Sequence, residues 1–142
     1  MVALSVTAAQ VIPVSGDKES GIAGAVITQG QSVYKSSTDG LWYPAKNNGT
    51  ADEAGGTNVG IAVSGAAIAG QGVVVAIDGA IVTLGVGAAP APTVPYFVGS
   101  AAGSLVPNAD LATTQKGTQV CTGLTLNQVL VRRVYHPNSV KP

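Results

Sequence analysis

The chain has 142 residues, of which only 10% are charged, and its seven Lys and Arg residues balance its seven Asp and Glu residues. A nucleic-acid-binding protein gains much of its affinity by neutralising phosphates with a basic surface, so this composition argues against nucleic acid as a partner. The one cysteine, Cys121, excludes a disulfide bond within the chain and is typical of a protein made in a reducing cytoplasm.

Residues 1–22 are predicted to form an extended N-terminal arm. Its apolar residues alternate and then recur in a second extended piece, and they are Val2, Leu4, Val6, Val11, Ile12 and Val14. Such a segment has too little apolar surface to hold itself in place. We therefore expect it to bind a partner, for example as a strand added to a neighbour's sheet edge; the alternative is an ordinary first strand of the fold. No basic residue precedes Lys18, so we expect no signal peptide.

Residues 23–135 are predicted to form one all-β domain, a small barrel or sandwich of short antiparallel strands. Nineteen glycines and eight prolines leave little room for a long helix, and the short runs rich in Val, Ile, Thr and Tyr between them are typical of strands. The expected strands are Ala25–Ile27, Ser32–Lys35, Leu41–Tyr43, Val59–Val63, Val73–Ile77, Ala80–Leu84, Tyr96–Val98, Leu105–Val106, Thr118–Cys121, Leu124–Leu126 and Val129–Tyr135. Residues 136–142 are expected to be a tail.

Two Asp-Gly pairs, Asp39-Gly40 and Asp78-Gly79, predict tight hairpins between the strands that flank them. The stretches Ala54–Ile77 and Gly79–Ala109 carry no charge and are long enough to raise the question of a membrane span. Their apolar runs are only four to six residues long, however, so we interpret them as strands and expect no membrane association.

A repeat with a constant offset of 63 residues is visible in the body of the chain. Ser37, Gly40 and Pro44 match Ser100, Gly103 and Pro107 at this offset. The same offset carries residues 60–63 onto residues 123–126, and residues 71–75 are echoed by residues 128–131 across a shorter turn. Chance similarity among strands rich in Gly and Val is the alternative. If the repeat is real, the body consists of two pseudo-repeated β units.

Residues that carry chemistry are few. One histidine, His136, and one cysteine do not supply the ligand set of a transition-metal site. A nucleophile pair of Cys121 and His136 is conceivable, but Cys121 lies in an apolar run, which favours a buried, inert thiol. The glycine-rich segments match neither a P-loop nor a dinucleotide fingerprint. We therefore expect no enzymatic activity, no cofactor and no metal.

Three aromatic residues, Tyr34, Trp42 and Tyr43, fall close together on neighbouring predicted strands. They are interpreted as an aromatic anchor that closes the end of the small β fold. The alternative is a platform on which a sugar ring stacks.

Several segments together resemble the head decoration, or capsid cement, proteins of tailed bacteriophages. They read AGAVITQGQSVYKSSTDGLWYPA, NVGIAVSGAAIAGQGVVVAIDGAIVTLG, VPYFVGSAAGSLVP and GTQVCTGLTLNQVLVRRV, and lie between Ala23 and Val134. The motifs concern strands and turns, and the family has no catalytic residues to carry over. The resemblance implies a β-rich protein, made in the bacterial host cytoplasm, that binds the capsid exterior of the virion, often as a trimer.

The function expected from the sequence is therefore that of a structural virion protein that stabilises a tailed-phage head. Its partners would be the major capsid protein and further copies of itself in a homotrimer. The six apolar residues of the N-terminal arm are the candidate capsid contacts. A carbohydrate- or receptor-binding β module of a phage fibre or a cell surface is the alternative.

Overall fold

The computed structural model describes residues 4, 6–50, 53–54, 58–85, 88, 90–107 and 117–135. This part of the chain is all-β, as the sequence predicts, apart from one turn of 3-10 helix, η1 (Ala8–Gln10). The strands are β1 (Ile12–Ser15), β2 (Lys18–Ile22), β3 (Ser32–Lys35), β4 (Trp42–Pro44), β5 (Val59–Ala62), β6 (Gly72–Ala76), β7 (Ile81–Thr83), β8 (Pro95–Val98), β9 (Leu105–Pro107), β10 (Thr118–Gly123) and β11 (Gln128–Tyr135).

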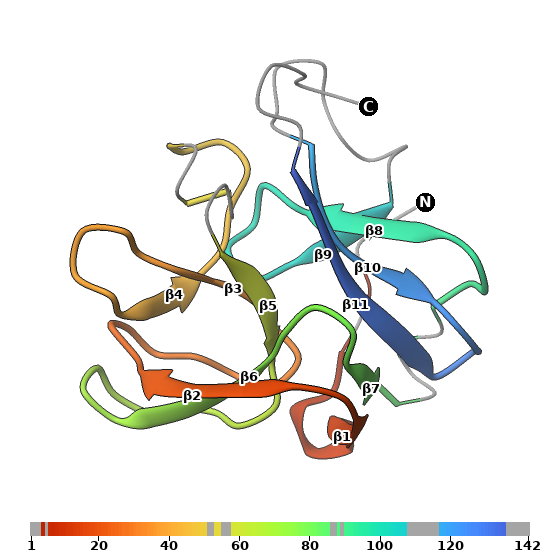
Figure 1. Cartoon of the computed structure of the whole chain (residues 1–142), viewed down its shortest axis with the longest axis horizontal. Coiled ribbons are helices and arrows are strands. Elements are labelled where there is room, and N and C mark those ends of the chain that lie inside the picture. Colours follow the sequence, from red (N-terminus) through yellow and green to blue (C-terminus); the bar gives the residue numbers. More distant parts are fainter. Residues whose placement is uncertain are drawn as a thin grey trace.

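The strands form two antiparallel sheets that pack as an open sandwich (Figure 1). Sheet 1 has the order β1-β7-β11-β10-β8-β9, and sheet 2 has the order β2-β6-β5-β3-β4. A single parallel bridge between Ala23 and Trp42 brings the chain after β2 against β4, so sheet 2 curls on itself without closing into a barrel. Of the two predicted architectures, the sandwich is therefore the better description.

The N-terminal segment is extended, as expected, but residues 12–22 are not separate from the body. β1 pairs with β7 at the edge of sheet 1, and β2 pairs with β6 at the edge of sheet 2. Lys18 and Glu19, two charged residues of the predicted arm, lie in β2. The small number of apolar residues led to the expectation that this segment is not held by the fold. Backbone hydrogen bonds to the two sheets hold it in place, and these bonds need no apolar side chains.

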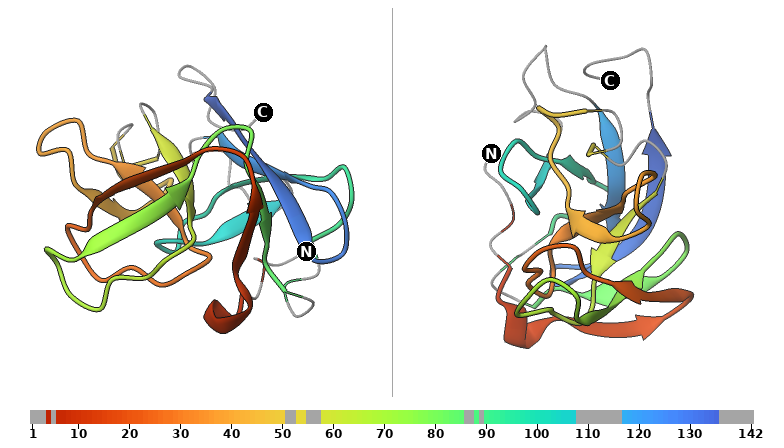
Figure 2. Two further views of the ribbon diagram at one scale, coloured as in Figure 1. Left: turned by 60° about the horizontal axis from the view of Figure 1, so that its bottom comes forward. Right: turned by 90° about the vertical axis from the view of Figure 1, so that its left-hand side faces the viewer.

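One bent ribbon connects the two sheets. β1 is antiparallel to β7, and β2 is antiparallel to β6. The segment β1–β2 passes from one sheet to the other at Gly16 and the segment β6–β7 does so at Gly79, and both glycines have positive φ (Figure 2). The crossing points are in contact, because a Cβ on Gly16 would lie 2.5 Å from the Cα of Ala80. Asp78-Gly79 is therefore not the hairpin that the sequence predicts, and it joins strands of different sheets.

The two sheets repeat the same strand order. β2 to β6 form a first unit and β7 to β11 form a second, and both read first-fifth-fourth-second-third across the sheet. The offset of 63 holds at the start of three strand pairs, from Lys18 to Ile81, Ser32 to Pro95 and Trp42 to Leu105. The predicted pair of pseudo-repeated units is therefore present in the fold.

The offset does not continue to the later strands. β3 pairs Ser32 with Ile61, and β8 pairs Pro95 with Thr122, so these partners are 61 residues apart. Two residues fewer separate the third and fourth strands of the second unit. As a result, the expected match of residues 60–63 to residues 123–126 is wrong, and residues 124–127 form the turn between β10 and β11 instead of the predicted strand Leu124–Leu126.

Two main apolar clusters stabilise the fold. The larger one lies between the sheets and includes Val59 and Ile61 of sheet 2 with Val98, Leu105 and Val129 of sheet 1. The smaller one lies inside the curl of sheet 2, around the completely buried Trp42. Every residue of β5 is buried, because β5 lies between the two clusters.

Candidate interaction surfaces

The residues with potential catalytic chemistry do not come together in the described part of the chain. Cys121 is completely buried in the core, and burial raises the pKa of its thiol far above the ordinary value. His136, its conceivable partner, lies outside the described residues. Among the described side chains there is no group of three or more His, Cys, Asp or Glu residues that could hold a metal ion.

The structure divides the candidate capsid contacts into two groups. Leu4 and Val6 are half-buried against the larger apolar cluster, and Val11 is buried within it. Ile12 and Val14 lie on β1 and are 57% and 52% exposed. Val2 lies outside the described residues. Exposed aliphatic side chains at the sheet 1 edge are therefore available to a partner, whereas Leu4, Val6 and Val11 contribute to the core.

The open side of β1 is a poor template for strand addition. Proline has no N–H to donate, and within sheets it is confined to edges and bulges. β1 contains Pro13, and its register with β7 shifts between Pro13 and Ser15. Prolines and bulges are devices that discourage pairing of exposed edges. A partner that binds β1 is therefore expected to pack against its side chains and not to extend sheet 1.

The other end of each sheet is covered by the chain itself. At β4, the amide of Gly24 donates to the carbonyl of Trp42, and at β9 the amide of Leu4 donates to the carbonyl of Leu105. The first donor follows β2 and the second belongs to the N-terminal segment, so distant segments occupy both edges. This protection directs attention to loops and exposed side chains as contact surfaces.

The three aromatic residues do not form one exposed platform. Trp42 is completely buried, as an anchor of the core would be, and it is out of reach of a sugar. Tyr34 and Tyr43 stack with their ring centroids 5.7 Å apart. The hydroxyl of Tyr43 donates to Asp39 over 2.7 Å, which raises the pKa of Tyr43, and the pKa of Asp39 is lowered mainly by the hydrogen bond from the amide of Leu41.

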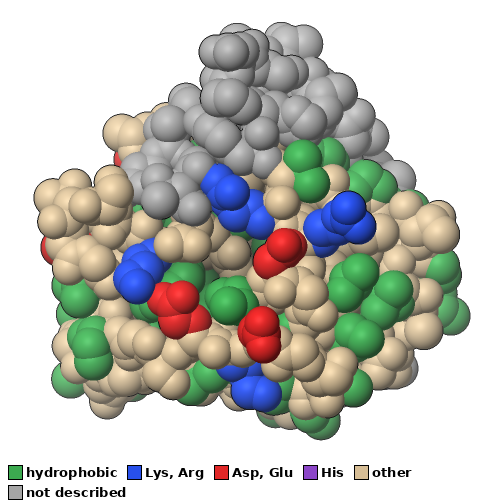
Figure 3. All heavy atoms as spheres, viewed as in Figure 1, with side chains coloured by type: hydrophobic (Ala, Val, Ile, Leu, Met, Phe, Trp, Pro, Cys, Tyr) green, Lys and Arg blue, Asp and Glu red, His purple; other side chains and the backbone are tan. Residues whose placement is uncertain are grey.

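Charged side chains of both signs gather on the face displayed in Figure 3, across the middle of the molecule. Lys35 and Glu19 form an ion pair of 3.0 Å, and Lys46 and Glu53 form another of 3.3 Å. Exposed pairs of this kind contribute little to stability. Sequence segments 20–34 and 58–77, in contrast, contain no charged residue. The surface that these two segments form is therefore uncharged.

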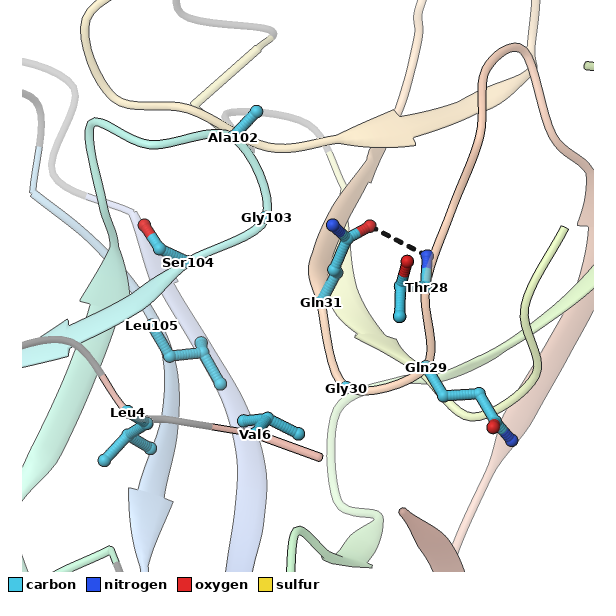
Figure 4. Close-up of a pocket in the computed structure, with 10 residues that line it drawn as sticks. All are labelled: Leu4, Val6, Thr28, Gln29, Gly30, Gln31, Ala102, Gly103, Ser104 and Leu105. Atoms are coloured by element: carbon cyan, nitrogen blue, oxygen red, sulfur yellow. Dashed lines mark hydrogen bonds between the residues drawn. The ribbon is translucent and has the colours of Figure 1, made fainter. Parts of the chain in front are cut away.

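A hollow of about 250 Å³ lies beside segment 20–34, which supplies part of its lining (Figure 4). It is lined by Leu4 and Val6, by residues 28–31 and by residues 102–105. The side chain of Gln31 points toward Gly103 across the hollow, and its carbonyl oxygen accepts a hydrogen bond from the amide of Thr28.

A second hollow, of about 430 Å³, shares Thr28 and Gln29 with the first. Ala8, residues 26–29, residues 65–67 and Gln71 line it. It lies between two loops that exchange hydrogen bonds, since the amides of Ile27 and Ala66 each donate to the other residue's carbonyl. No charged side chain lines either hollow.

Sequence reasoning missed several exposed aliphatic residues outside the N-terminal segment. Ile22, Val26 and Ile68 are exposed near the second hollow, and Leu124 and Leu126 are exposed in the turn between β10 and β11. The strand expected at Ala25–Ile27 is wrong, because residues 25 and 26 lie in a loop and Ile27 makes only an isolated bridge with Ala66. A usable signal existed for Ile68, a large aliphatic residue in a segment of Gly and Ala that lacks the alternation of a strand.

Comparisons with protein-family models, with curated proteins and with solved structures found no match to the chain. Within the described residues, no helix is long and apolar enough to cross a membrane.

Proposed function

We propose that this chain is a structural virion protein that binds the outside of a tailed-phage capsid and stabilises it. The proposal starts from the resemblance of residues 23–134 to head decoration proteins. It makes the chain a protein-binding module without catalysis, made in the host cytoplasm and incorporated into the virion.

The observation that carries the proposal is the pair of exposed residues on β1. Ile12 and Val14 sit on a strand fixed by pairing with β7, so binding them does not require a segment to become ordered. Pre-organised apolar side chains lose little conformational entropy on binding. Each side chain is already about half-buried, so burying the remainder is worth roughly 1–1.5 kcal/mol per residue, and several copies of the contact on one shell would add avidity.

The alternative of a carbohydrate- or receptor-binding module is weakened by the aromatic residues. Trp42 is buried in the core of sheet 2, and Tyr34 and Tyr43 already stack on each other. No observation on the described residues favours this alternative over a protein-binding surface.

Phage heads that lack the protein provide the test. Purified protein is mixed with such heads, and the bound fraction is measured by co-sedimentation and by added density in electron microscopy. The double variant Ile12→Asp with Val14→Asp is expected to lose most of its binding, since each carboxylate would have to be desolvated in an apolar contact. The double variant Leu124→Asp with Leu126→Asp, which places the same two charges at exposed positions in the turn between β10 and β11, is the matched control.

Two results would contradict the proposal. Absence of wild-type binding to any undecorated head would remove the function itself. Undiminished binding of the double variant, with normal folding, would keep the function and move the contact away from β1.

A further inference from the structure

The end of sheet 2 carries three exposed aliphatic residues, Ile22, Val26 and Ile68, on segments that hydrogen-bond to one another. Val26 is 59% exposed and Ile68 is 62% exposed. Ile22 ends β2, Val26 follows in the loop toward β3, and Ile68 lies in the loop between β5 and β6. Figures 1 and 2 show these loops side by side at one end of the molecule. Clustered exposed aliphatic residues are typical of interaction sites.

Hydrogen bonds hold the two loops in a fixed relation. The amides of Ala23 and Gly70 donate to the carbonyls of Gln71 and Ala23, and Ile27 and Ala66 exchange a second pair of bonds. The side-chain carbonyl of Gln71 also accepts from the amide of Ala67 over 2.6 Å. The three residues are therefore presented on a braced surface.

A projection and a hollow lie next to each other on this surface. Ile68 directly follows Ala67, which lines the hollow of about 430 Å³, and Ile68 itself is not part of the lining. Val26 lies on the rim, being both exposed and a lining residue. An exposed aliphatic side chain beside an uncharged hollow is placed to enter the equivalent hollow of another molecule.

Such an arrangement is self-complementary about a two-fold axis. In a two-fold contact the same patch serves both molecules, so the projection of each enters the hollow of the other. Like residues then approach one another, and a charged patch would repel itself. Segments 20–34 and 58–77, which form this surface, contain no charged residue.

We propose that the loops containing Val26 and Ile68 form a two-fold contact between two copies of this chain, with Ile68 of each copy in the hollow of the other. This contact goes beyond the proposed capsid function and does not depend on it, because it lies on loops of sheet 2 and not on β1. It also differs from the expected homotrimer. A ring of three is built head to tail and needs its projection and its hollow on different faces.

Sedimentation of the purified protein from micromolar to millimolar concentration tests the proposal. The wild-type mass is expected to rise with concentration from 14.0 kDa toward twice that value. Ile68→Asp should remain a monomer throughout, because a carboxylate would have to be buried in the partner's apolar hollow. Ile12→Asp is the matched control, since Ile12 is similarly exposed at 57% but lies on β1, and it should dimerise like the wild type.

Cross-linking tests the geometry of the contact. Cys121 is completely buried, so a cysteine introduced at a surface position provides the reactive thiol. Copies carrying Ile68→Cys are mixed with copies carrying Thr28→Cys, which places a thiol in the hollow, and the mixture is oxidised. The mixture is expected to give several-fold more disulfide-linked dimer than either variant alone.

Each remaining outcome counts against the proposal. A wild-type protein that stays monomeric, or that forms trimers, would overturn it. So would unchanged dimerisation of Ile68→Asp. If Ile68→Asp instead loses binding to phage heads while the wild type is monomeric, the surface belongs to the coat protein and not to a second copy.

Discussion

The two five-stranded units have the same strand order and differ in what each sheet encloses. The first unit curls around its own cluster, in which Trp42 packs with Val33 and Val75. In the second unit the equivalent of Trp42 is Leu105, which belongs to the cluster shared by both sheets. The second unit completes its core with β5 of the first unit, whose Val59 and Ile61 face it.

This difference shows that a repeated topology does not require a repeated core. Almost any residue can make the backbone hydrogen bonds of a sheet, so one strand order is compatible with different side chains, whereas core packing depends on side-chain volume. One large residue lets the first unit bury an interior of its own. The smaller Leu105 leaves the second unit dependent on its neighbour, and replacing Trp42 and Leu105 in turn tests this view.

Replacing Trp42 by Ala should destabilise the fold by about 3–5 kcal/mol, because it empties the centre of the smaller cluster. Urea denaturation measures the loss. Hydrogen exchange should show that amides of β2, β3 and β6 lose more protection than those of β8 to β11, since the cluster lies within the first unit. Leu105→Ala is the matched control, and its loss of protection should extend to both sheets. Equal loss throughout the chain in both variants would show that the first unit has no core of its own.

The paired glycines of the ribbon provide a second comparison. Gly16 and Gly79 have φ values of +89° and +93°, so alanine is strained at both positions, at a cost of roughly 1–2 kcal/mol each. Gly79 has open space around its Cβ position, whereas a Cβ on Gly16 would also lie 2.8 Å from the carbonyl oxygen of Gly79. Gly16→Ala is therefore expected to lower the melting temperature clearly more than Gly79→Ala. Equal losses of melting temperature in the two variants would mean that the backbone at the crossing shifts to make room for a side chain at position 16.

The smallest effect concerns Asp39, which lies in the hairpin between β3 and β4. The matching hairpin of the second unit, between β8 and β9, has no carboxylate in its turn. Because the pKa of Asp39 is lowered from its ordinary 3.8, its contribution to stability is present above that value and is lost as the pH falls through the lowered pKa. The wild type should therefore lose slightly more melting temperature than Asp39→Asn between about pH 5 and about pH 2. In the same variant the pKa of Tyr43, raised by Asp39, should fall in an absorbance titration. Parallel melting curves for the two proteins would contradict this.

The sequence predicts the local features of this fold well. Gly40 and Gly103, which the offset of 63 matches, both have positive φ in the structure. The hairpin expected at Asp39-Gly40 is present, since β3 pairs with β4 across it, but its turn is longer than the tight turn that the Asp-Gly pair predicts. The amide of Ser36 donates to the carbonyl of Leu41, so four residues and not two make the connection. Additional hydrogen bonds from Asp39 to Leu41 and Tyr43 favour the longer turn.

Pairing between distant segments was not predictable from the residues alone. Asp78-Gly79 has the composition of a hairpin turn, but Gly16 lies against Ala80 and the chain crosses to the other sheet. Similarly, the alternation of Leu4 and Val6 is the same whether a segment faces its own core or a partner. The exposed Ile12 and Val14 cannot be told from the buried Val11 without knowing that β1 lies at an edge.

The stretch from β6 to β7 has a mechanical consequence. β6 lies between β2 and β5, and β7 lies between β1 and β11, so this stretch joins interior strands of both sheets. A tension that draws the sheets apart is carried by the covalent backbone at both crossings, between Ala76 and Ile81 and between Ser15 and Lys18. It loads the hydrogen bonds of β6 and β7 along the strands, so they resist together in shear instead of opening one after another like a zip. The molecule is therefore expected to be stiffest in the direction that would separate its two sheets.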